Sequence, residues 1–490
     1  MGRVIRVLCG LGARREVACA APTQVVAEGG QEEKDQSAAV SFENVNTYTA
    51  KAKARRLDRW LDSVVKFSGS EFAFFFILAA LLAWAFLGIP FGQTTDWQVG
   101  ISDAQAIINL VFDSFLMRQQ LNAYDQCLAV SCCLRSRTIS HKRMLRHLVK
   151  SGKYHKVNLA QFHGLGRTEF ASELPTENLL GRICTAVSVF MGHIVTVTGF
   201  WICIFIWIGF GQYCGWSSQW LFYINSATSA LMVFMLAFLA NIRERHNDYA
   251  AKCLELIHAA DAALELRLRT VTGDTIANQT CVIPAPKVDR IQRGINYYAD
   301  LVGTLLGIAI LFLVLIVWVL IGPALSFDSN WWLLIGTYAG LIGMNDGFVL
   351  RNVYNQIGRY ENAQFDQQNF EDMDMLSLIG VTEFTEERVV NKSLSSRISI
   401  AMGNFCSHEM TVVLGAVTIL GLIIGASAMN WSVTGQLLCN VPPSIIESFF
   451  TLILITGHNI GDARRRVDLN NIYFRRLQLI SYLNIPVNQS

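Results

Sequence analysis

The sequence predicts an all-α integral membrane protein with eight transmembrane helices, arranged as four repeated helical hairpins with cytoplasmic helical extensions. Composition, long apolar runs and the distribution of basic residues predict this class. Of the 490 residues, 52% are hydrophobic and only 16% are charged, whereas soluble proteins carry about a quarter charged residues. Runs of about 18 apolar residues can cross a hydrocarbon core of about 30 Å. Eight such runs cover residues 70–89, 99–117, 186–209, 219–240, 300–321, 331–350, 410–428 and 440–457.

The basic residues predict the orientation of these runs. The 40 Lys and Arg residues all lie before the first run, after an even-numbered run or after the last run. The turns after runs one, three, five and seven contain none. Cytoplasmic loops are enriched in Lys and Arg, so both termini and all long connections are expected in the cytoplasm. The opposite turns hold tryptophans typical of a membrane interface, namely Trp97, Trp216, Trp220, Trp331, Trp332 and Trp431.

The hairpins share one outline, in which a charged lead-in, an apolar run, a short turn, a second run and a polar tail follow one another. Trp84, Trp207 and Trp318 each stand near the end of a first run, shortly before a glycine. We expect a largely disordered cytoplasmic tail over 1–60, hairpin units over 61–135, 183–270, 298–380 and 406–490, and cytoplasmic connections over 136–182, 271–297 and 381–405. Apolar residues at three- and four-residue spacing in the polar tails predict amphipathic helices, which either pack together or mediate contacts in a homo-oligomer.

Ionisable residues stand at almost the same depth in three of the first runs. An ionisable side chain in the middle of a bilayer costs about 2.5–3.5 kcal/mol, so it usually faces a cavity or a partner. The alternative is a position near the inner membrane surface, where a helix N-terminus favours an acid. The residues concerned are Glu71, His193, His408 and Glu409.

The second runs carry polar residues on one helical face. Ser102, Asn109 and Asp113 lie at offsets of 0, 7 and 11, which share a face of an α-helix. Run eight places Glu447 on such a face, and run four offers only uncharged candidates. Oxygen and nitrogen groups of this kind suit Fe(II), Mn(II) or Zn(II), whereas Cu(I) prefers sulfur ligands. The predicted metal-path residues are Asp113, Asn109, Ser102, His193, Asp346, Asn345, His408, Glu409, Glu447 and Glu71.

No motif for nucleotide hydrolysis accompanies these residues. The sequence contains neither a G-x-x-x-x-G-K-[ST] run nor an Asp-Lys-Thr-Gly run, so we expect transport driven by gradient and membrane potential, without cofactor or enzymatic activity. The basic lead-in over 51–59 is expected at lipid heads rather than on nucleic acid. Cys214 and Cys439 either form a disulfide or stay free. A patch in the loop after run two matches no tight zinc module, so a basic solvated loop is favoured over a metal-receiving or regulatory patch. Its residues are Cys127, Cys132, Cys133, His141, His147, His155 and His163.

The chain resembles the fungal low-affinity iron(II) permease family in four stretches. These are Gly69-Ser-Glu-Phe-Ala-Phe74, Trp97-Gln98, Leu239–Asp248 and the following Ala251–Ile257. The resemblance implies plasma-membrane uptake of Fe(II), with zinc, copper and manganese as lesser substrates, but it supplies no set of ligands. Two other functions stay open from the residues alone. One is a channel for anions or small solutes with a polar pore, and the other is a membrane scaffold without transport.

Overall fold

The computed structural model describes residues 11–26, 53, 55–152, 174, 177–327, 329–381 and 394–483. The expected disorder around 28–35 lies outside these residues, as do His155 and His163 of the loop patch. Within them the protein is almost entirely helical, and the exception is a two-stranded antiparallel sheet.

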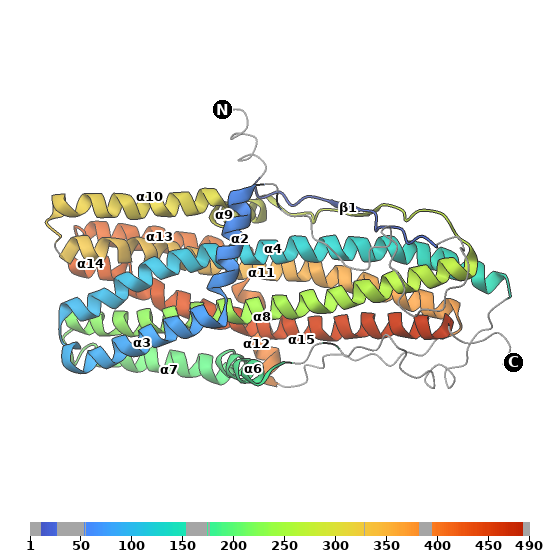
Figure 1. Cartoon of the computed structure of the whole chain (residues 1–490). Helices are drawn as coiled ribbons and strands as arrows, with labels where there is room; N and C mark the ends of the chain where they lie inside the picture. The colour runs from blue at the N-terminus through green and yellow to red at the C-terminus, as the bar shows by residue number, and fades with distance from the viewer. Residues whose placement is uncertain are drawn as a thin grey trace, which may run out of the picture.

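Four long helices form a ring at the centre of the molecule (Figure 1). They are α4 (Thr95–Lys150), α8 (Ser218–Thr272), α11 (Ser329–Leu378) and α15 (Val441–Leu483). Each packs against two of the others, so that the order around the ring is α4, α8, α15 and α11. Their 43 to 56 residues correspond to about 65–85 Å of helix at about 1.5 Å per residue. This is more than twice the thickness of a bilayer core, so one half of the ring extends beyond any membrane.

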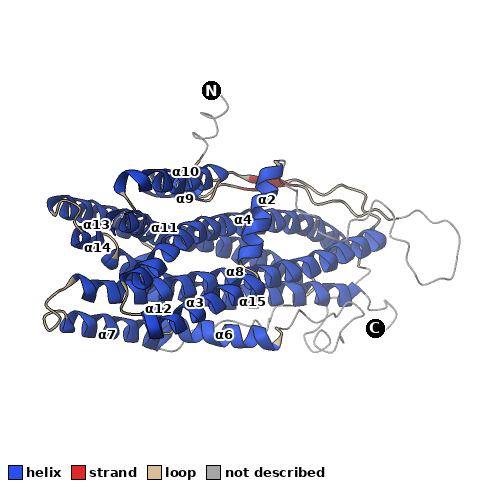
Figure 2. Cartoon of the chain, turned by 60° about the vertical axis from the view of Figure 1, so that its left-hand side comes forward, coloured by secondary structure: helices blue, strands red, loops and turns tan. Residues whose placement is uncertain are grey.

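Four apolar helices surround only one half of this ring, as Figures 1 and 2 show. They are α3 (Glu71–Phe91), α7 (Ile194–Phe210), α10 (Leu305–Ile321) and α13 (Glu409–Ala428). Large apolar side chains on them are exposed, such as Phe72, Phe86, Phe205, Leu313 and Leu414. An apolar surface of this extent belongs in lipid rather than in water. This half of the molecule is therefore the membrane-spanning half.

Among the described residues, six helices are long and apolar enough to cross a membrane, and the bent pair of α6 (Leu179–Met191) and α7 makes up to seven. The one expected span that is missing from this set is the second run, 99–117, which belongs to α4. Its ring-facing side carries buried polar groups at Ser102, Asn109 and Asp113, which lower its mean hydropathy.

A separate short helix precedes each outer helix, which corrects the expected course of the first runs. These helices are α2 (Arg56–Ser68), α6, α9 (Arg290–Val302) and α12 (Leu394–Cys406), each of 13 residues. A two-residue break follows each one, and α6 and α7 meet at 54°. The runs 186–209 and 300–321 are therefore interrupted, because Gly192 and Gly303 cap the end of one helix and the residue after each caps the start of the next.

The ring holds every one of these breaks by a hydrogen bond to a carbonyl oxygen. In each case the donor is a side chain on a ring helix from a different hairpin. Arg118 donates to Gly303 (3.3 Å), Asn241 to Gly69 (3.0 Å), Asn352 to Ser407 (2.7 Å) and Thr456 to Gly192 (2.7 Å). The outer helices are thereby fixed to the ring at one level.

Three of the hairpin turns are closed by stacked indole rings. The centroids are 4.3 Å apart in Trp84–Trp97, 3.9 Å in Trp207–Trp220 and 4.5 Å in Trp318–Trp331. The second indole N–H of each pair donates to the first tryptophan's carbonyl oxygen. In the fourth hairpin the Cys439 thiol donates to the Leu422 carbonyl oxygen at 3.4 Å. In three hairpins the first stacked tryptophan lies 15 residues after the residue whose carbonyl oxygen is bound at the break. The second tryptophan follows 13 residues later, and the residue that donates to a break in another hairpin follows 21 residues after that. Positions 407, 422, 435 and 456 repeat this spacing in the fourth hairpin.

The other half of the ring is a helical bundle with its own apolar core. Leu134, Ile257, Leu376 and Leu479 are among its buried residues, one from each ring helix. The expected amphipathic tails thus pack against one another within one chain.

Strand β1 (Val17–Cys19) pairs antiparallel with β2 (Cys281–Ile283) and lies against α4. It lies inside the stretch expected to be a largely disordered tail. Three residues are too few for a strand signal in sequence.

A cluster of fully buried charges lies at the centre of this bundle. Arg476 pairs with Asp261 (2.7 Å) and Asp372 (3.0 Å), and Arg137 pairs with Glu265 (3.2 Å). Arg269 also pairs with Glu265 (2.9 Å), so three arginines face three carboxylates. All four ring helices contribute, and buried ion pairs of this kind can specify how helices align.

We expect His141 to make the stability of this bundle sensitive to acid. Burial, reinforced by the charges of Arg476, Arg137 and Arg269, holds the pKa of His141 well below its usual value. Folded protein then binds fewer protons than unfolded protein below about pH 6.5, so stability falls as the pH falls, by up to about 1.4 kcal/mol per unit. The thermal unfolding midpoint of His141→Asn should therefore change less between pH 7.5 and 5.5 than that of the wild type. Equal changes would contradict this assignment.

Candidate functional site

Two polar layers cross the membrane-spanning half of the ring. The Ser102 layer consists of Ser102 on α4, Asn225 on α8, Gly336 on α11 and Asn440, which immediately precedes α15. The Ser102 hydroxyl oxygen accepts from the Asn225 amide (2.8 Å) and from the Asn440 amide (3.4 Å). A Cβ on Gly336 would lie 2.9 Å from the Asn440 amide nitrogen. The glycine therefore leaves room for a neighbour's polar group.

The Asn109 layer lies seven residues further along each ring helix and consists of Asn109, Met232, Gly343 and Glu447. The Asn109 amide donates to a Glu447 carboxylate oxygen at 2.6 Å. A Cβ on Gly343 would collide with both groups. On the opposite side, the Met232 sulfur accepts a weak bond from Ser448 at 3.6 Å. Seven residues of α-helix place the two layers about 10 Å apart.

Three buried carboxylates lie at and beside the Asn109 layer. Asp113, Asp346 and Glu447 are each 2% exposed or less, and Asp113 lies within the electrostatic reach of the other two. Asp346 accepts from the Tyr298 hydroxyl at 2.7 Å. Among the described residues, none of the three forms an ion pair, and one oxygen each of Asp113 and Glu447 has no donor. Because buried charges destabilise a protein unless they are paired, this cluster favours a bound cation.

The donor set around the carboxylates is mixed and open. Within the described part of the chain, no three His, Cys, Asp or Glu side chains are arranged as a closed metal site. The Asn109 layer instead offers a carboxylate, an amide oxygen and a thioether. Divalent metal ions bind groups of these kinds, with the oxygens suited to hard ions and the thioether to softer ones.

The structure does not bring the outer-helix candidates to this cluster. Glu71, His193, His408 and Glu409 all stand at the breaks, where the outer helices begin. The imidazole nitrogens of His193 and His408 accept from backbone N–H groups two residues ahead, at 3.3 and 3.2 Å. Their shared depth thus has a local cause, since acids and acceptors satisfy the first N–H groups of a helix. We leave these four residues out of the proposed path.

The structure therefore unites five of the predicted residues in the ring: Ser102, Asn109, Asp113, Asp346 and Glu447. Asn345 is half-buried beside Asp346. Asn440, Gly336 and Gly343 were not predicted from the sequence, and no single position stood out among the uncharged candidates of run four. The signal that finds them is the seven-residue interval between the layers, which occurs in all four second runs.

Cys214 and Cys439 do not form a disulfide. Both are free thiols, Cys214 is exposed and Cys439 is buried. The Cys439 thiol donates within its own hairpin, to Leu422.

Fold and site together define an all-α integral membrane protein whose ring encloses uncompensated carboxylates. The family model described as low affinity iron permease matches residues 180–280 and 395–487. The low-affinity iron/zinc ion transport protein fet4 of Schizosaccharomyces pombe is 34% identical over 502 residues, which cover 98% of this chain and 85% of the relative. The low-affinity Fe(2+) transport protein of Saccharomyces cerevisiae is 34% identical over 458 residues, covering 87% and 83%.

The chain belongs to the low-affinity iron permease family. The family resemblance found in the sequence is thereby confirmed. No solved structure matches the chain.

Proposed function

We propose that this protein carries divalent metal ions across a membrane, iron(II) foremost and zinc second. The observation that carries the proposal is the uncompensated cluster of Asp113, Asp346 and Glu447 inside the ring. The two fungal relatives are named as iron/zinc and Fe(2+) transport proteins, which supports this choice of ion. Anions would be repelled by three carboxylates, so an anion channel fits the site less well.

We further propose that α4 is an eighth membrane span and that four hairpins surround a pseudo-fourfold axis. The shared spacing of 15, 13 and 21 residues supports this arrangement. So do the four short turns without Lys or Arg, which favour a cytoplasmic position for both termini and the helical bundle. The plasma membrane is the membrane we propose, and we assign the protein no catalytic step.

In this proposal the ion passes from the Ser102 layer to the Asn109 layer and on to Asp113. The amides and hydroxyl of the Ser102 layer replace part of its water shell. Glu447 and Asp113 then hold it by charge, and the absence of a closed donor set among the described residues lets it leave. An inside-negative potential supplies roughly 4.6 kcal/mol per 100 mV for a divalent ion, twice the single-charge value.

Uptake of radioactive iron tests the proposal. Cells without their own iron uptake should accumulate Fe(II) when they express this chain, and excess zinc should lower the rate. Collapse of the membrane potential should lower it as well, because the ion enters as a charge. Purified protein that passes chloride in proteoliposomes, without iron uptake in cells, would contradict the proposal.

A further inference from the structure

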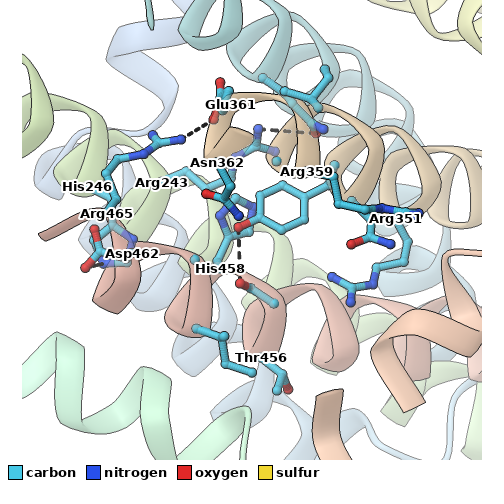
Figure 3. Close-up of a pocket in the computed structure, with 18 of the residues that line it drawn as sticks. Arg243, His246, Arg351, Arg359, Glu361, Asn362, Thr456, His458, Asp462 and Arg465 are labelled. Atoms are coloured by element: carbon cyan, nitrogen blue, oxygen red, sulfur yellow. Dashed lines mark hydrogen bonds and ion pairs between the residues drawn. The ribbon is translucent and has the colours of Figure 1, made fainter. Parts of the chain in front are cut away.

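A basic cavity lies between the carboxylate cluster and the helical bundle. Its volume is about 200 Å³, and all four ring helices and α12 line it. Arg243, Arg351 and Arg465 gather around it (Figure 3). The membrane site attracts cations, so a group of arginines directly beyond it calls for a separate explanation.

The two carboxylates that line this cavity already have partners. Glu361 forms an ion pair with Arg465. Asp462 pairs with Arg466 and lies 3.5 Å from the His246 imidazole. Neither acid is within ion-pair distance of Arg243 or Arg351, and within the described part of the chain these two guanidinium groups form no ion pair.

Arg351 and Arg243 are nevertheless buried, at 5% and 3% exposure. Two nitrogens of Arg351, Nε and Nη1, have no acceptor among the described residues. Arg243 donates through Nη2 to the Gln120 side-chain oxygen at 3.5 Å, and its Nη1 has no acceptor within the described ranges. Buried polar groups almost always have partners, and a buried unpaired charge destabilises the folded protein.

The surrounding helices make room for the Arg351 guanidinium. A Cβ on Gly457 of α15 would collide with its Nη1, and a Cβ on Gly403 of α12 would collide with its Nη2. The Tyr354 hydroxyl is directed elsewhere and donates to the Gly457 carbonyl oxygen at 3.1 Å. The side chain is thus accommodated by two glycines without being neutralised, which is the arrangement of a preformed anion site.

We propose that this cavity binds an oxyanion of the phosphate class, with Arg351 and Arg243 as its principal ligands. The planar guanidinium group presents paired N–H donors that match two phosphate oxygens at once. A water molecule takes up about 30 Å³, so the cavity has room for one phosphate group with some water. The group comes either from free phosphate or from a lipid headgroup at the inner membrane surface.

A bound oxyanion would also change the route of the metal ion, a consequence that rests on the proposed function. A cation that leaves Asp113 toward the bundle approaches Arg351 and Arg243, whose charges oppose it. A phosphate group on these arginines cancels that repulsion. The site would then couple metal release to the anion on the cytoplasmic side.

Thermal unfolding of the purified full-length chain, without metal, tests the binding site. One arm uses nanodiscs of phosphatidylcholine with inorganic phosphate at constant ionic strength. The other arm adds a phosphoinositide to the nanodiscs. Inorganic phosphate, the phosphoinositide or both should raise the unfolding midpoint of the wild type. The control variant Arg464→Met, which changes an exposed arginine paired with Asp366, should show the same rise.

Arg351→Met should show two effects together. Its midpoint without anion should be higher than that of the wild type, because an unpaired buried charge is removed. Its affinity for the anion should fall at least tenfold. Arg351→Lys, which keeps the charge but loses the paired donors, should bind several-fold more weakly and serves if the methionine variant does not fold.

A midpoint shift with phosphate alone or with the lipid alone supports the site and identifies the source. No shift with either source overturns the proposal, and so does an unchanged shift in Arg351→Met and Arg351→Lys. Because no metal is present, the outcome does not depend on transport. If phosphate binding is intact but the protein does not transport metal, only the proposed transport function is overturned.

Discussion

Iron uptake should fall at least tenfold when Asp113 is replaced by Asn, and equally when Glu447 is replaced by Gln. Both replacements keep the size of the side chain and remove the charge that attracts the ion into the ring. Neither should unfold the protein, because each removes a buried charge that forms no ion pair with a described residue. The measurement is the initial rate of radioactive iron uptake at equal surface abundance.

Glu71→Gln is the matched control for these variants. Glu71 is also a carboxylate in the membrane-spanning half, but it is exposed at the start of α3. Its replacement should leave the uptake rate within about twofold of the wild type. Wild-type uptake by both Asp113→Asn and Glu447→Gln would remove the carboxylate cluster from the path.

Arg476→Met should destabilise the protein by about 3–5 kcal/mol, the usual effect of removing one partner of a buried ion pair. The arginine is fully buried and joins Asp261 on α8 to Asp372 on α11. Its loss leaves two carboxylates at the centre of the bundle with one positive charge fewer. Thermal and denaturant unfolding of the solubilised protein measures the effect.

The control for this variant lies on the same helix. Arg464 pairs with Asp366 at 2.8 Å, but the side chains are 43% and 60% exposed. Exposed pairs contribute at most about 1 kcal/mol, so Arg464→Met should be close to the wild type. A similar loss of stability in both variants would show that burial does not increase the contribution of the Arg476 ion pairs.

Much of the membrane architecture was predictable because lipid imposes a strong pattern on sequence. Apolar runs identified the outer helices and the apolar stretches of α8, α11 and α15. The breaks at Gly192 and Gly303 were not predictable, because a change of helix direction leaves hydropathy unaltered. Strand β1 was missed because three residues carry too little pattern.

The candidate site was predictable only in part. Helical spacing placed Ser102, Asn109 and Asp113 on one face, and the structure shows all three buried in the ring. The partners of these residues come from other helices, so no spacing along one run could reveal the bond from Asn109 to Glu447. Equal depth in the outer helices also selected His193 and its counterparts, which the structure places at the helix breaks. Their depth reflects where those helices begin.

The location of a bound metal ion tests the central claim most directly. A structure of the protein with Mn²⁺, whose anomalous scattering marks its position, should show the ion inside the ring. We predict that carboxylate oxygens of Asp113 or Glu447 lie at about 2.0–2.6 Å from it, as for hard divalent cations. A metal bound only at the helix breaks, beside His193 or His408, would contradict the account.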